Sequence, residues 1–203
     1  MDKGRILIMS GPSGSGKSSI INYILSEVEN SVLSISTTSR EPREGEIDGM
    51  DYNFVEKSEF KEMIQNDKFL EYENVHGNFY GTELEFVEDA INFGKLLVFD
   101  VDTRGRESIL KAFPDLTVTL FVTTPTKHIL EERLRSRGTE NEEQLQKRLK
   151  NATEEMKDLE KFDFLIINDD LDNAKDSAIH IAKMTLLKPS KDMSDELQKF
   201  WDM

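Results

Sequence analysis

The residues with the clearest chemical purpose lie near the start of the chain. The segment from Gly11 to Ser18 is GPSGSGKS and satisfies the pattern G-x-x-x-x-G-K-[ST], a glycine-rich loop that binds phosphate groups. Small residues let consecutive backbone N–H groups surround phosphate oxygens, and the N-terminus of the following helix adds partial positive charge. Lys17 is expected to bridge the β and γ phosphates of a nucleoside triphosphate, and the Ser18 hydroxyl to bind Mg²⁺. The predicted phosphate site comprises Gly11, Pro12, Ser13, Gly14, Ser15, Gly16, Lys17, Ser18 and Ser19.

The loop alone does not decide whether the nucleotide is hydrolysed, acts as a switch or donates a phosphoryl group. A structural turn between a strand and a helix is the plain alternative to any of these. A switch GTPase is another, because the residues from Asp102 to Gly105, DTRG, match the pattern D-x-x-G. The guanine-reading motif N-K-x-D is missing, however, since the residues from Asn173 to Asp176 are NAKD. The sequence therefore does not favour a switch.

A second anion site is predicted around a pair of arginines. Arg40 and Arg43 lie three residues apart around a proline in the segment SREPREGE, and Tyr52 follows. Guanidinium groups bind phosphate through paired hydrogen bonds, and phenolic hydroxyls add neutral donors. Two solvated surface arginines are the alternative for this pair taken by itself.

Four apolar runs at residues 5–9, 95–102, 116–124 and 162–169 predict the strands that position these loops. Each is followed by a stretch that is compatible with a helix, except that the first leads directly into the phosphate loop. Alternation of this kind is typical of βαβ units and predicts an open parallel sheet covered by helices. The ends of such strands meet at one edge, where ligands bind.

Two further segments interrupt this alternation. Residues 37–90 contain short alternating pieces and one predicted helix at 57–66, which indicates a small mixed insertion. Residues 127–161 are helical in pattern, with Thr139 as the expected N-cap. One apolar stripe marks a single long helix there: Leu145, Leu149, Ala152, Met156 and Leu159. Beyond Pro189, apolar residues in the tail predict a short helix that docks on another surface, and the sequence does not indicate its role.

Composition restricts the class of protein. The chain of 203 residues fits one domain with insertions, and its 26 basic and 40 acidic residues give a net charge of −14, which argues against a nucleic-acid partner. It has no cysteine and only three histidines, which argues against disulfides and structural zinc. No apolar run approaches the 18 or so residues that span a bilayer, and the beginning of the chain does not look like a secretory signal. We expect a cytoplasmic protein without a membrane partner.

Seven segments together resemble guanylate kinase, in order and across roughly residues 4–187. They are the phosphate loop, TTSREPREGEIDGMDYNFV, FLEY, GNFYGT, LLVFDVD, RLRSRGTE and IINDDLD. The resemblance implies an α/β fold with a P-loop NTPase-type parallel sheet covered by helices, a small mixed α+β GMP-binding insertion and a helical lid. It also implies the reaction ATP + GMP → ADP + GDP, with ATP and GMP as the molecules bound.

On the acceptor side, the resemblance implies which residues bind GMP. The phosphate is expected to contact Arg40, Arg43, Tyr52 and Tyr80, and the guanine edge Ser36, Glu71 and Thr82. One carboxylate can accept hydrogen bonds from both N1–H and the N2 amino group of guanine, whereas adenine presents an acceptor at N1, so Glu71 would bind guanine and repel adenine. A solvated strand carboxylate is the alternative for Glu71.

On the donor side, the resemblance implies a set of lid arginines and strand-end carboxylates. Arg133, Arg137 and Arg148 are expected to close over the triphosphate, and Asn168 to contact adenine. Asp100 is expected to organise Mg²⁺, with Ser18, and also to bind at the GMP clamp, and Asp102 is expected to lie at the GMP site. Either aspartate alone is as readily explained as a cap for the next helix. The expected catalytic residues are Lys17, Arg40, Arg137, Arg148 and Asp100.

The resemblance also sets the expected boundaries, and it leaves two alternative functions and the oligomeric state open. The core comprises residues 1–36, 91–132 and 156–188, the insertion 37–90, the lid 133–155 and the tail 189–203. The chain departs from the family at Thr103 and Arg104, where a bulkier residue and a glutamine are usual. Another nucleoside monophosphate kinase and a non-catalytic protein-binding domain are the alternatives in function, and monomer or homodimer are both allowed.

Overall fold

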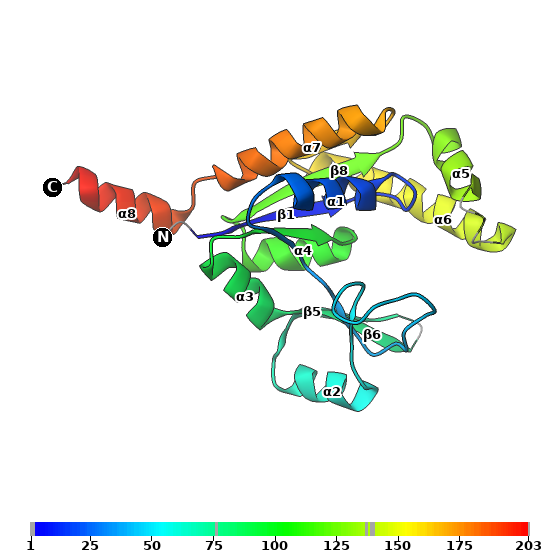
Figure 1. Cartoon of the computed structure of the whole chain (residues 1–203), viewed down its shortest axis with the longest axis horizontal. Helices are drawn as coiled ribbons and strands as arrows, with labels where there is room; N and C mark the ends of the chain where they lie inside the picture. The colour runs from blue at the N-terminus through cyan, green and yellow to red at the C-terminus, as the bar shows by residue number, and fades with distance from the viewer. Residues whose placement is uncertain (1–2, 76, 137, 139–140, 203) are drawn as a thin grey trace.

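The computed structural model describes residues 3–75, 77–136, 138 and 141–202 (Figure 1). At its centre is a parallel sheet with the strand order β2-β7-β1-β8-β9. The strands are β1 (Arg5–Ser10), β2 (Ser31–Leu33), β7 (Leu96–Asp100), β8 (Thr117–Thr123) and β9 (Phe164–Ile167). The four predicted strands are confirmed, whereas the three-residue edge strand β2 was not predicted because it is too short to carry a pattern.

Helices cover both faces of this sheet. Leu7 and Met9 of β1 pack in a core cluster with α1 and α7, whereas Ile6 and Ile8 of the same strand pack against α3 and α4. The alternation arises because successive side chains of a strand point to opposite faces. The covering helices are α1 (Lys17–Glu27), α3 (Leu84–Asn92), α4 (Thr103–Ala112) and α7 (Leu171–Leu186). The predicted helix-covered parallel sheet is therefore confirmed.

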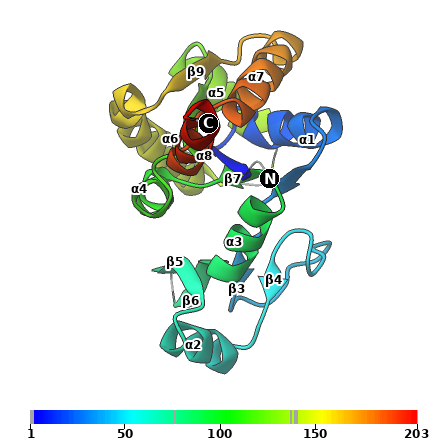
Figure 2. The ribbon, with the colours of Figure 1, turned by 90° about the vertical axis from the view of Figure 1, so that its left-hand side faces the viewer.

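The insertion forms a separate small sheet below the core in Figures 1 and 2. Its strand order is β4-β3-β6-β5, with both parallel and antiparallel pairs. Its elements are β3 (Thr37–Thr38), β4 (Asn53–Phe54), α2 (Lys57–Gln65), β5 (Phe69–Val75) and β6 (Asn78–Glu83). Phe60 of α2 is fully buried and stacks on Phe69 and Phe79 at centroid distances of 4.3 and 5.4 Å. The expected boundary at residue 90 falls inside α3, whose buried side chains belong to the core.

The lid region consists of two helices that pack on each other. They are α5 (Lys127–Ser136) and α6 (Glu142–Glu155), joined by their own apolar cluster of Leu130, Leu134, Leu145, Leu149 and Ala152. The prediction of one helix through Leu159 was wrong, because α6 ends at Glu155 and a 3-10 helix, η1 (Met156–Lys161), follows. The N-cap prediction was also wrong. Asn141 and Gln144 form a reciprocal capping box, while Thr139 lies outside the described residues.

The tail forms helix α8 (Lys191–Trp201), which projects away from the core in Figure 1. The Ser190 side chain caps its first turn, and Lys3 forms an ion pair with Asp192 at its base. The predicted helix in the tail is therefore confirmed. Its apolar side chains Leu197, Phe200 and Trp201 are 53–85% exposed and are not docked on the core. Among the described residues, no helix is long and apolar enough to cross a membrane.

Candidate active site

The phosphate loop connects β1 to α1 at the carboxyl edge of the sheet. Gly11 and Gly16 adopt positive φ angles of 131° and 101°, a region that disfavours residues with a Cβ atom. A Cβ on Gly11 would lie 2.1 Å from the Val122 carbonyl oxygen, and one on Gly16 would lie 2.3 Å from the Asn168 amide nitrogen. Both glycines are thus required by backbone conformation and by close packing, which explains the spacing found in the sequence.

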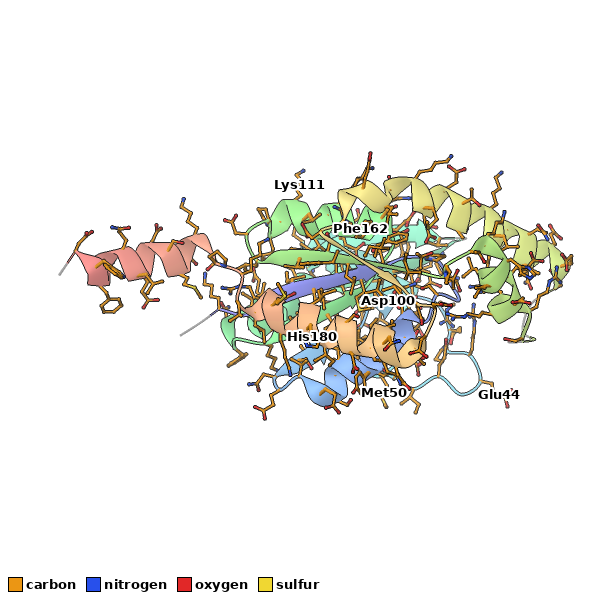
Figure 3. The ribbon with its side chains drawn as sticks, turned by 90° about the horizontal axis from the view of Figure 1, so that it is seen from above. Glu44, Met50, Asp100, Lys111, Phe162 and His180 are labelled. Carbon is orange, nitrogen blue, oxygen red and sulfur yellow. The ribbon has the colours of Figure 1, made fainter. Side chains whose placement is uncertain are left out.

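Lys17 and Asp100 form an ion pair in the wall of a cavity of 290 Å³ that we call the phosphate cavity. It is lined by the loop from Gly11 to Ser18, by the end of β7 and by Glu155. Figure 3 labels Asp100. The Nζ of Lys17 donates to the Gly11 carbonyl at 2.5 Å and lies 3.8 Å from Oδ1 of Asp100. Partial burial raises the pKa of Asp100, and the charge of Lys17 acts in the opposite direction. A cation and oxygen donors therefore share one small space at the loop.

Asn168, which follows β9, binds the phosphate loop through its side chain. Its side chain is buried, and Nδ2 donates a 2.7 Å hydrogen bond to the Ser15 carbonyl. The Asn168 carbonyl in turn accepts a 3.0 Å bond from Arg133 of α5. Its Oδ1 is buried and has no hydrogen-bond partner in the protein. This position supports the loop directly, whereas the expected contact with adenine stays a prediction.

A second cavity, of 330 Å³, lies between the insertion and the core, and we call it the insertion cavity. Ser36, Glu71 and Tyr80 line it from the insertion side, and Asp102 from the core side. Oγ1 of Thr82 donates to Oε1 of Glu71 at 2.7 Å. Burial raises the pKa of Glu71, the hydrogen bond from Thr82 lowers it, and the nearby carboxylate of Asp102 raises it again. The predicted guanine-reading residues are thus gathered around one cavity.

Arg40 lies between an acid and two aromatic rings. Its guanidinium forms two 2.9 Å hydrogen bonds to the carboxylate of Glu46 and lies 5.3 Å from the ring centroid of Tyr52. The ring centroids of Tyr52 and Tyr80 are 6.0 Å apart. The guanidinium group of Arg40 is therefore oriented before any ligand binds. Its partner Glu46 was not predicted, because nothing in the spacing distinguishes Glu46 from the other acidic residues of the segment.

The predicted clamp partner Arg43 donates its backbone N–H to Oε2 of Glu46 at 2.7 Å, the carboxylate that also pairs with Arg40. Arg43 also lines a third cavity, of 600 Å³, beside the lid. This lid cavity is also lined by Ser13, Asn151 and Glu155. Nη1 of Arg148 on α6 donates a 2.6 Å hydrogen bond to Oγ of Ser13. Arg148, Asn151 and Glu155 follow at spacings that place them on one side of α6. Phosphate loop, insertion and lid thus meet at this cavity.

The three cavities are neighbours. Val101 and Asp102 line both the phosphate cavity and the insertion cavity, while Ser13 and Glu155 line both the phosphate cavity and the lid cavity. Oδ1 of Asp102 also accepts the backbone N–H groups of Arg104 and Gly105 at 3.0 Å, which makes it the N-cap of α4. The helix-cap interpretation of Asp102 is therefore confirmed, and it coexists with a place in the wall of both cavities.

Comparison with known proteins agrees with this arrangement. A sequence profile described as guanylate kinase matches residues 3–183. The chain belongs to the guanylate kinase family. It is 48% identical to a guanylate kinase of Wolinella succinogenes over 92% of this chain and 86% of that protein, and 43% identical to one of Helicobacter pylori over 97% and 95%. A crystal structure of guanylate kinase from Anaplasma phagocytophilum superimposes with a TM-score of 0.73 at 30% identity, covering 92% of this chain and 88% of that one.

Within this guanylate kinase fold, three features near the site were not predicted. They are the partner of Arg40, the carboxylate of Glu155, and an ion pair between Arg104 and Glu73. Arg137, predicted as a catalytic lid residue, lies outside the described residues. Arg135, which is not among the predicted site residues, forms ion pairs with Glu131 and Glu142 on the lid.

Proposed function

We propose that the chain transfers the γ-phosphoryl group of ATP to the phosphate of GMP and releases ADP and GDP. The observation that carries this proposal is the shared wall of the phosphate and insertion cavities at Val101 and Asp102. A triphosphate at the loop and a monophosphate in the insertion would bring their phosphates together there. Membership of the guanylate kinase family and the names of the relatives support the same reaction.

On the acceptor side, the proposal assigns the insertion cavity to guanine. Glu71, ionised and supported by Thr82, would accept both N1–H and the N2 amino group, while Ser36 and Asp102 would complete the polar wall. A site of this kind discriminates by roughly 10⁴ to 10⁵, because the wrong base leaves buried polar groups unpaired. Arg40, Arg43, Tyr52 and Tyr80 are proposed to bind the phosphate of GMP.

On the donor side, the loop from Gly11 to Ser19 is proposed to bind the ATP phosphates. Lys17 would contact the β and γ oxygens, which requires its ammonium group to exchange the Gly11 carbonyl for a phosphate. Arg133 and Arg148, with Arg137, would neutralise charge from the lid. Asn168 is proposed to act through the loop that it holds and to contact adenine.

Mg²⁺ is the metal that this reaction implies, and the oxygen donors at the loop suit it. Ser18 and Asp100 line the phosphate cavity and are proposed to hold the ion, Asp100 through a water molecule. Among the described residues, no group of three or more His, Cys, Asp or Glu side chains is arranged to hold a metal ion. When bound, Mg²⁺ would neutralise charge on the transferred phosphoryl group.

The chemical step needs positioning more than acid–base catalysis. An oxygen of the GMP phosphate forms a bond to the γ-phosphorus while the bond from that phosphorus to the β,γ-bridging oxygen breaks, and ADP leaves with the electron pair. No general base is required, because the attacking phosphate oxygen is already ionised near neutral pH. The protein must align the two phosphates and exclude water, which otherwise would accept the phosphoryl group.

Two further proposals concern the surroundings of the enzyme. We propose a cytoplasmic location, and the net charge of −14 supports the absence of a nucleic-acid partner. Monomer and homodimer both remain compatible with the fold.

The test is a coupled assay of ADP formation with GMP, AMP, dTMP and UMP as acceptors. We expect GMP to be preferred by at least about 10³ in kcat/KM over AMP, because AMP presents an acceptor to Glu71. Comparable rates with another monophosphate would contradict the assignment, and ADP formation that is independent of any acceptor would indicate an ATPase.

A further inference from the structure

Arg104 and Glu73 form an ion pair between the core and the insertion. Nη1 of Arg104, in the first turn of α4, lies 2.5 Å from Oε1 of Glu73 on β5. Both side chains line the insertion cavity. The pair therefore crosses between two parts of the molecule at the edge of the proposed guanine site. Arg104 is also one of the two positions at which this chain departs from the family pattern.

Glu73 is linked by strand geometry to the proposed guanine reader. Glu71 and Glu73 are two residues apart on β5, so their side chains lie on the same face of the sheet. Their partners on β6 are Thr82 and Tyr80, which also belong to the proposed GMP site. The position of Glu73 is thus coupled, through the backbone of β5, to the position of Glu71 at the cavity.

Arg104 is linked equally closely to the core side of the same cavity. Its backbone N–H donates a 3.0 Å hydrogen bond to Oδ1 of Asp102, which begins α4. Because Asp102 and Val101 form the wall shared with the phosphate cavity, the backbone of Arg104 is fixed relative to that wall. The side chain of Arg104 then extends to the insertion.

We propose that Arg104 is a positioning residue for GMP: its ion pair with Glu73 holds β5 at the distance from α4 at which Glu71 and Asp102 face one guanine base. This inference rests on the proposed function and extends it to a residue that is not among the predicted site residues. Arg104 acts through Glu73 and β5 and is not assigned a contact with GMP.

The size of the effect follows from solvent exposure. The side chains of Arg104 and Glu73 are 77% and 45% exposed. Exposed pairs are weak and sensitive to salt, so loss of this pair is expected to weaken GMP binding roughly two- to fivefold. ATP binding at the loop does not involve β5 and should not change.

The experiment compares the wild type with Arg104→Gln, Glu73→Gln, the double variant and the charge exchange Arg104→Glu with Glu73→Arg. Calorimetry gives the Kd for GMP in the absence of ATP, and steady-state kinetics give the KM values and kcat. Glu85→Gln is the matched control, because Glu85 forms another exposed ion pair, with Lys68, away from the cavity. Thermal unfolding checks that all variants fold.

We expect each single variant to raise the Kd for GMP two- to fivefold, with KM for ATP and kcat within twofold of the wild type. The double variant should be no worse than either single variant, and the charge exchange should restore binding at low salt. High salt should bring the wild type toward the single variants. Glu85→Gln should bind GMP like the wild type.

Two results would overturn this inference and leave the proposed function intact, provided that the wild type still phosphorylates GMP. One is an unchanged Kd for GMP in both single variants. The other is a loss confined to Arg104→Gln, which would indicate that Arg104 contacts GMP directly. A wild-type protein that neither binds nor phosphorylates GMP would instead refute the proposed function, and the inference with it.

Discussion

Arg148 of the lid and Ser13 of the phosphate loop are joined by a 2.6 Å hydrogen bond from Nη1 to Oγ, although 135 residues separate them in the sequence. The bond brings a cation of α6 to the rim of the phosphate cavity, which Ser13 lines. A triphosphate in the loop would add acceptor oxygens close to this guanidinium. The lid is thus connected to the donor site by a side chain that can exchange a serine hydroxyl for phosphate.

Replacement of Arg148 by alanine is therefore expected to reduce kcat by roughly a factor of 10³, because arginines that stabilise a transferred phosphoryl group contribute 10³ to 10⁵. Steady-state kinetics with ATP and GMP check this. Arg135→Ala is the matched control, since Arg135 lies on the same lid but is paired with Glu131 and Glu142. Equal losses in both variants would show that the lid needs its arginines only for folding.

Replacement of Lys17 by alanine should lower kcat/KM for ATP by a factor of 10³ or more while the protein stays folded. The reason is that Lys17 is the cation expected at the β and γ phosphates, and its side chain lines the phosphate cavity and belongs to none of the three apolar core clusters. Lys111→Ala is the control, because Lys111 is an exposed lysine of α4 that points away from the molecule (Figure 3). Activity retained by the Lys17 variant would refute the placement of ATP at the loop.

Replacement of Asn168 by alanine should destabilise the protein and weaken ATP binding together. It removes the buried 2.7 Å bond to the Ser15 carbonyl, and leaving a buried acceptor unsatisfied costs about 1 to 3 kcal/mol. Urea denaturation measures the free energy of unfolding, and kinetics should show a higher KM for ATP with an unchanged KM for GMP. A protein as stable as the wild type would contradict the supporting role of Asn168.

Acid is expected to weaken GMP binding through Glu71. Burial raises the pKa of this carboxyl, and guanine recognition needs the ionised form, so KM for GMP should rise as pH falls toward that raised value. The rise begins at higher pH than an ordinary glutamate would give. The phosphate of GMP itself titrates near pH 6, so Glu71→Gln is the necessary control.

In that control, weak binding of GMP should show only the pH dependence of the ligand phosphate. Profiles of KM between about pH 5 and pH 8 for the two proteins make the comparison. Identical profiles, apart from a constant factor, would show that Glu71 does not titrate in the GMP site.

The sequence predicts the phosphate loop and the sheet because both depend on local patterns. Gly11 and Gly16 are required by positive φ angles, and the continuous apolar runs reflect strands that helices bury on both faces. The end of α6 was not predictable in the same way. Leu159 continues the apolar spacing of the helix, yet the backbone changes to a 3-10 helix after Glu155, and the spacing of side chains does not record that change.

The candidate site shows the same division. Glu71, Thr82 and Arg40 lie in motifs and were predicted, whereas Glu46 and Glu73 were not. The latter two acquire their importance from partners placed by tertiary structure: Arg40 is six residues from Glu46, and Arg104 is 31 residues from Glu73. A chain with 40 acidic residues offers no local signal that distinguishes these two from the rest.

The most direct test of the central claim follows the phosphoryl group itself. The protein is incubated with Mg²⁺, GMP and ATP labelled with ³²P at the γ-phosphate, and the products are separated by thin-layer chromatography. The account predicts that the label appears in GDP, that its transfer requires GMP, and that little inorganic phosphate forms. Label released as inorganic phosphate at the same rate with or without GMP, or no release of label at all, would contradict it.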